Sequence, residues 1–157
     1  MSQARTEVTS VLGSAAIVYA VAVAVNYPWE LAESPLYEGT GDSSRMWWHC
    51  FVASLGDGLL VLLILGAGFV AFGRARWFVA PGAGGYALMV AVGLAVAVAV
   101  EWIALHPLRR WSYTPRMPVV PGLGVGLLPV LQMLVLPPLV FRVAGCLSNR
   151  VSQGEQQ

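Results

Sequence analysis

Acidic and amide side chains interrupt long apolar stretches of this sequence, and these residues are the most able to do chemistry. Asp57 stands in a run that is almost free of charge, Glu101 lies near the end of another, and Gln132 lies near the middle of a third. An ionisable group is costly in lipid, so each one suggests a function. We predict Asp57 and Glu101 as catalytic groups that act in acid–base chemistry or stabilise a cation. A structural ion pair with an arginine is the alternative for Asp57.

Helical spacing describes the surroundings of Asp57. Cys50 and Ser54 precede it by seven and three residues, so at about 3.6 residues per turn the three side chains share one stripe of a helix. His49 lies roughly a quarter turn away from that stripe. We predict His49 and Gln132 as substrate-binding residues. The alternatives are a solvated histidine at the membrane interface and an amide that hydrogen-bonds between helices.

Residues 106–132 form the most distinctive segment, which reads HPLRRWSYTPRMPVVPGLGVGLLPVLQ. Its prolines preclude a plain helical hairpin, and its alternating glycines favour an irregular start to the helix that follows. We predict that Arg109, Arg110, Trp111 and Tyr113 bind substrate, with the arginines forming charge-assisted hydrogen bonds to an anionic headgroup. The alternative is a plain interfacial anchor, in which arginines bind lipid phosphates and aromatic rings lie in the headgroup layer.

The elements that position these residues follow from the hydropathy pattern. Of 157 residues, 57% are hydrophobic and only 11% are charged, against about a quarter in an ordinary soluble domain. We predict an all-α, polytopic membrane protein with one integral membrane domain, a four-helix transmembrane bundle and an irregular Pro/Gly-rich segment before the fourth span. Each apolar run approaches the roughly 20 residues that a helix needs to cross hydrocarbon. The expected spans are residues 8–25, 48–72, 86–105 and 123–141, followed by a polar tail at 142–157.

The first apolar run has a second interpretation. Residues 1–24 combine Arg5, an apolar stretch and an Ala-Val-Ala end, which also fits a cleaved signal peptide and would leave three spans. With four spans, the arginines divide five against four between the two faces, which slightly favours termini in the cytoplasm. We therefore expect both termini to lie in the cytoplasm. We expect a multi-pass protein of a cell membrane, namely a bacterial inner membrane.

Four spans would bring the polar residues to one membrane face. The end of the first span, the start of the second, the end of the third and the start of the fourth all meet there. A site would open on this face and extend inward toward Asp57 and Gln132. The face collects Asn26, Glu30, Glu33, His49, Cys50, Asp57, Glu101, His106, Arg109, Arg110, Trp111, Tyr113 and Arg116.

No recognised motif assigns a cofactor or a reaction. His49, Cys50 and Asp57 lack the spacing of a zinc site, and adjacent helical residues point about 100° apart, so we predict no metal site. The sequence has no haem attachment motif, phosphate loop or nucleophile signature, so the cofactor is unassigned and enzymatic activity stays open. A net charge of +1 argues against a nucleic-acid partner.

Three functional classes remain, all with the lipid bilayer as the immediate partner. The favoured class is a membrane-embedded enzyme or binder of a lipid or isoprenoid-type substrate, which would use the polar cluster at one face. The second is a small accessory or assembly subunit, whose polar stripe would satisfy a membrane protein partner. The third is an ion or proton conductor with Asp57 as the relay, and it requires a homo-oligomer because four short spans make a poor pore.

Overall fold

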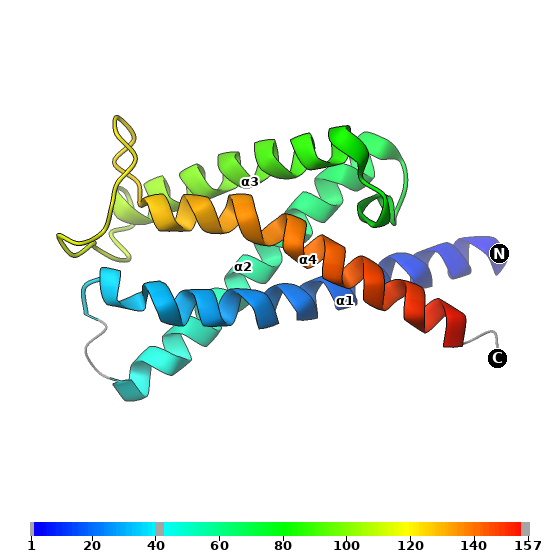
Figure 1. Ribbon diagram of the computed structural model, residues 1–157, viewed down its shortest axis with the longest axis horizontal. Coiled ribbons are helices and arrows are strands. Elements are labelled where there is room, and N and C mark those ends of the chain that lie inside the picture. Colours follow the sequence, from blue (N-terminus) through cyan, green and yellow to red (C-terminus); the bar gives the residue numbers. More distant parts are fainter. Residues whose placement is uncertain (1, 40–42, 155–157) are drawn as a thin grey trace.

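The computed structural model describes residues 2–39 and 43–154 and consists of four long helices (Figure 1). Within those residues it contains no strand. Each helix is long and apolar enough to cross a membrane. This confirms the predicted all-α, four-helix transmembrane fold of a multi-pass membrane protein. The helices are α1 (Ser2–Glu33), α2 (Ser43–Phe72), α3 (Gly82–Leu105) and α4 (Leu127–Gly154), with short 3-10 helices η1 (Ser34–Leu36) and η2 (Trp77–Val79).

The first helix is longer than the apolar run that predicted it. The run ends at residue 25, whereas α1 continues for about two more turns to Glu33. Asn26, Glu30 and Glu33 fall outside the predicted span, and in the structure they lie on α1. They can remain helical at membrane depth because their side chains find hydrogen-bond partners inside the bundle.

The fourth helix starts later and ends later than predicted. Gly122 and Gly124 adopt positive φ, which prevents helix formation there, and α4 begins at Leu127. The helix then continues to Gly154, through most of the expected polar tail. It does so because one face keeps packing against the bundle: Val140, Ala144 and Ser148, spaced one turn apart, are all buried.

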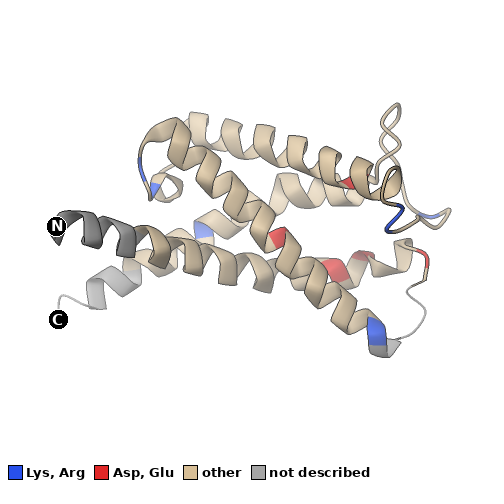
Figure 2. Ribbon diagram, turned by 180° about the vertical axis from the view of Figure 1, so that it is seen from behind, with Lys and Arg blue, Asp and Glu red and all other residues tan. Residues whose placement is uncertain are grey.

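Both connections that carry the candidate site lie at one end of the bundle. Figure 1 shows the α1–α2 and α3–α4 connections at that end and both chain termini at the other. Among the residues whose side chains the structure describes, Figure 2 shows the acidic ones in the half of the bundle nearer these connections. The two halves therefore differ in chemistry, and we call them the polar half and the terminal half.

An apolar core holds the terminal half together. Trp77 of η2 is almost completely buried and stacks on Phe72 and Phe141, with both ring-centroid distances at 5.4 Å. Its indole N–H donates to the Leu65 carbonyl oxygen at 3.0 Å. Val18 and Ala22 of α1, which signal-peptide cleavage would remove, belong to the same core. Every member of this buried cluster is apolar.

Two glycines allow close approach between the packed elements. A Cβ atom at Gly68 would overlap the Trp77 indole, and one at Gly93 would overlap the backbone carbonyl oxygen of Met133. The first glycine lets η2 insert beside α2, and the second lets α3 contact α4. Small residues at helix contacts are the usual route to tight packing in lipid.

We expect Gly68→Ala to destabilise the protein. Phe72 and Phe141 pack against the Trp77 ring, so the ring cannot move away from the added methyl group. Overpacking of this kind lowers the free energy of unfolding by about 1–3 kcal/mol. Each kcal/mol lowers the thermal unfolding midpoint by about 2–4 °C. Thermal unfolding in mild detergent measures the effect. Gly66→Ala is the matched control, since this glycine lies on the same helix with open space around it. Equal midpoints for the two variants would contradict this packing.

Candidate functional site

A buried hydrogen-bond network joins α1, α2 and α4 in the polar half. Gln132 Nε2 donates to Asn26 Oδ1 at 2.9 Å and to Glu30 Oε1 at 3.0 Å. It also donates to Asp57 Oδ2 at 2.9 Å. Asn26 Nδ2 donates to the Ala22 carbonyl oxygen at 2.8 Å, which turns Asn26 Oδ1 toward Gln132. All three neighbours of Gln132 Nε2 are oxygen acceptors, so the amide nitrogen rather than the amide oxygen must occupy this position.

Glu30 and Asp57 form a carboxyl pair within this network. Both carboxyl groups accept a hydrogen bond from the same Gln132 amide nitrogen. The charged groups that act most strongly on Asp57 are Glu30 and Glu33 rather than an arginine. Two carboxylates held together in this way repel each other, and a proton on one of them relieves the repulsion. A pair with one proton offers a proton donor and a proton acceptor side by side.

Glu33 and Glu101 form a second carboxyl centre, nearer the connections. Glu33 is 3% exposed and accepts hydrogen bonds from Trp29 Nε1 at 2.8 Å and from the Tyr37 hydroxyl at 3.3 Å. Glu101 is 5% exposed and accepts a hydrogen bond from the Tyr113 hydroxyl. Burial raises the pKa of Tyr37 and of Tyr113 above the ordinary value. Both phenols therefore remain protonated donors at neutral pH.

The Pro/Gly-rich segment predicted before the fourth span is irregular, as expected, and it docks on the α1–α2 connection. Tyr37 and Tyr113 form an antiparallel bridge, and the Thr114 N–H donates to the Leu36 carbonyl oxygen at 2.9 Å. The Tyr113 hydroxyl also accepts a hydrogen bond from the Gly126 N–H at 2.7 Å. One phenol thus joins the α3 carboxyl to the turn that precedes α4.

A cavity of about 890 Å³ lies between the helices of the polar half. Small-molecule sites in proteins commonly measure about 300–1,000 Å³. Carboxyl groups of both centres and the Gln132 side chain line this cavity, while Leu60 and Val100 supply apolar wall. Arg109 and Arg110 also line it and are exposed. The cavity thus combines an apolar wall with acidic groups and with exposed basic residues.

The cavity brings together all but one of the predicted site residues. The exception is Tyr113, which is not part of the lining but holds Glu101 through its hydroxyl. The Trp111 indole N–H is buried beside Glu101 without completing a hydrogen bond. The role of each of these residues remains a prediction. The predicted residues in the lining are Asp57, Glu101, His49, Arg109, Arg110, Trp111 and Gln132.

Sequence reasoning placed Asn26, Glu30 and Glu33 at the correct face but left them out of the predicted site. The hydropathy pattern indicated a loop after residue 25, which separated these side chains from the helices. A signal was nevertheless present, because the three residues recur at intervals of four and three, which is the spacing of one helical face.

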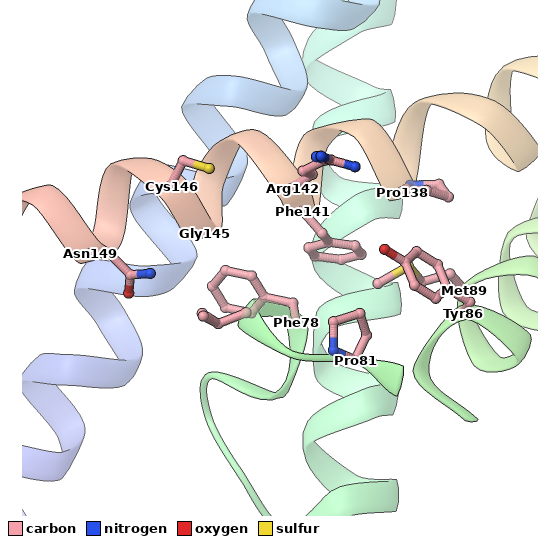
Figure 3. A pocket seen from close by; sticks show the side chains of 11 residues that line it. Phe78, Pro81, Tyr86, Met89, Pro138, Phe141, Arg142, Gly145, Cys146 and Asn149 are labelled. Atoms are coloured by element: carbon pink, nitrogen blue, oxygen red, sulfur yellow. The ribbon is translucent and has the colours of Figure 1, made fainter. Parts of the chain in front are cut away.

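A smaller cavity of about 250 Å³ lies in the terminal half (Figure 3). Phe78 and Phe141 line it together with Arg142 and Asn149 of α4. Arg76 Nη2 donates to Asn149 Oδ1 at 2.8 Å nearby. Among the described residues that line this cavity none is acidic, so it lacks the carboxyl groups of the larger cavity.

We expect Tyr113→Phe to lower stability, because it leaves the Gly126 N–H without its acceptor and Glu101 without its donor. Leaving buried partners unsatisfied costs about 1–3 kcal/mol, which the thermal unfolding midpoint will show. Tyr86→Phe is the control, since Tyr86 is 46% exposed and its hydroxyl makes no hydrogen bond with the described residues. That change should stay within about 0.5 kcal/mol. A Tyr113→Phe variant as stable as Tyr86→Phe would show that the phenol does not support the site.

Comparison with known proteins adds no family to this description. The chain matches no protein-family model, no curated protein and no solved structure. Its function must therefore be inferred from the geometry of its own cavity.

Proposed function

We propose that this chain is a membrane-embedded enzyme that binds a lipid or isoprenoid-type substrate in the large cavity and acts on it by proton transfer. The carboxyl pair of Glu30 and Asp57 carries the proposal, because the two groups meet on one amide nitrogen and line a cavity of about 890 Å³. Acid–base catalysis requires a proton donor or acceptor within hydrogen-bond reach of the bound substrate. The position of this pair at the wall of a space large enough for a ligand supports that role.

The amphiphilic class of substrate follows from the cavity lining. Leu60, Val100 and Met133 offer apolar contact for a hydrocarbon chain. Arg109 and Arg110 offer charge-assisted hydrogen bonds to an anionic part of the same molecule. A molecule that lies in the bilayer and carries a polar end matches both surfaces.

The polar residues take distinct roles in this proposal. Asp57 and Glu30 exchange the proton with the substrate, and Gln132 holds the two carboxyl groups together. Glu101 is the second acid–base or cation-stabilising group, and Tyr113 positions it. The proposed substrate-binding residues are His49, Arg109, Arg110, Trp111 and Gln132, together with Tyr113 through its hold on Glu101.

The apolar core of the terminal half argues against the conductor alternative. A proton relay from Asp57 to the opposite face would need polar side chains or water along its path. Among the described residues, the buried side chains of the terminal half are apolar except for Ser14 and Ser148, and its core includes Val18, Ile64 and Phe141. Neither serine is an ionisable group, which favours a polar region that ends inside the bundle, as a binding site does.

The burial of the polar cluster argues against the accessory-subunit alternative. Asn26, Glu33 and Gln132 are almost fully enclosed by the helices of their own chain. Their hydrogen bonds are formed within this chain. A stripe that served a partner protein would instead lie on the outer surface of the bundle.

Mass spectrometry of the small molecules that copurify in mild detergent tests whether the cavity is a binding site. Gly56 lines the cavity, and no atom lies within 4 Å of a Cβ placed there, so a side chain can begin at this position without a clash, and Phe adds bulk at the cavity wall. We expect a discrete lipid or isoprenoid species with the wild-type protein and its loss in Gly56→Phe. Gly66→Phe is the matched control, equally open but outside the lining, and should retain the species.

The Asp57→Asn variant in the same experiment tests for catalysis. Asparagine retains an oxygen for Gln132 and an amide for Glu30, so the fold should persist while the carboxyl group is lost. We expect this variant to copurify with unreacted substrate, which differs from the wild-type species in mass or in bond position. An identical species in both samples would contradict the enzyme proposal. Bulk lipid alone in every sample would contradict the site itself.

A further inference from the structure

One acceptor atom in the large cavity lacks a partner. Gln132 is 3% exposed, and in its side-chain hydrogen bonds with the described residues Nε2 is the donor. In the part of the chain that the structure describes, Gln132 Oε1 accepts no hydrogen bond. The protein does not enclose this oxygen completely, and Gln132 lines the cavity. The carbonyl oxygen of this largely buried side chain therefore presents an unfilled acceptor to whatever occupies the cavity.

The hydrogen-bond donors nearest the two carboxyl centres are committed to the protein. The Gln132 amide donates to the network, the Trp29 indole and the Tyr37 hydroxyl donate to Glu33, and the Tyr113 hydroxyl donates to Glu101. The Trp111 indole N–H and the exposed Arg109 and Arg110 also line the cavity, and they can serve an anionic part of the occupant. An ammonium group brings three donors and no acceptor. The region around Gln132 thus fits a group that only donates.

The negative charge of the cavity lining also favours an ammonium group. Glu30, Glu33, Asp57 and Glu101 all line the cavity, and the strongest charged neighbours of Glu33 and Asp57 are other carboxyl groups. Such a cluster is costly in low dielectric unless it is protonated or paired with a cation. Rings of Tyr37 and Trp111 also line the cavity, and aromatic rings attract cations.

We propose that the polar end of the occupant that reaches Gln132 is a protonated amine, so that the substrate class is an amine-bearing amphiphile. Its ammonium group donates to Gln132 Oε1 and to carboxyl oxygens of the two centres, and its apolar chain lies along the wall that Leu60 and Val100 provide. This inference rests on the proposed function, because it names the occupant of the same cavity.

Binding of two amphiphiles of equal chain length tests the inference. Octylamine and octanol are titrated into the full-length protein in non-ionic detergent, and intrinsic tryptophan fluorescence reports binding. We expect the Kd of octylamine to be lower than that of octanol by at least about tenfold, because a hydrogen bond to a charged group exceeds a neutral one by about 1.4 kcal/mol. Glu101→Gln removes a charge at constant size and should weaken octylamine binding about tenfold, but not octanol binding.

The controls separate this inference from the proposed function. Gly56→Phe should abolish the response to both amphiphiles, whereas Gly66→Phe should leave it unchanged. Equal affinities in the wild type, or equal weakening by Glu101→Gln, would overturn the ammonium assignment while the cavity remained a binding site. A response that persists in Gly56→Phe would overturn the proposed function as well. If Glu101→Gln does not fold, Glu33→Gln removes a charge from the same centre and makes the same comparison.

Discussion

One amide nitrogen at the centre of the bundle is shared by three oxygen acceptors, and the rest of the polar half depends on this contact. An amide NH2 group has two hydrogens, whereas Asn26, Glu30 and Asp57 present three acceptors to Gln132. Two of these acceptors are carboxyl groups, and a proton on one of them would relieve both the shortage of hydrogens and the repulsion between like charges. The interaction that ties α4 to α1 and α2 is therefore also the one that brings two acid–base groups together beside the cavity.

The terminal half of the bundle contributes mainly to stability, and the polar half holds the groups that can do chemistry. In the terminal half, Trp77 and Phe141 fill the space between helices, and glycines permit the close contact. In the polar half, hydrogen bonds join the helices in addition to a smaller apolar cluster around Met133, and the docked Pro/Gly-rich segment closes the connections through Tyr113. A directional contact fixes side chains without filling the space between them. This explains how the larger cavity can persist in the polar half.

The sequence was enough to predict the spans and the face at which the candidate residues gather, because lipid requires long apolar helices and the spans alternate in direction. Spacing alone placed Asp57, Glu101 and Gln132 at one end. It did not reveal the partnership of Asp57 with Glu30, because hydropathy treats an acidic residue after an apolar run as the start of a loop. The rotation of each helix about its axis decides such contacts. The bond between Glu101 and Tyr113 depends in addition on the path of residues 106–126, which no periodic pattern describes.

A structure of the protein determined in a lipid mesophase tests the central claim, that the polar half encloses a ligand site built on the Gln132 network. The account predicts elongated non-protein density in the cavity, with its polar end within hydrogen-bond distance of Gln132 Oε1 and its chain along Leu60 and Val100. A cavity closed by movement of the helices, with Gln132 Oε1 bonded to the protein itself, would contradict it.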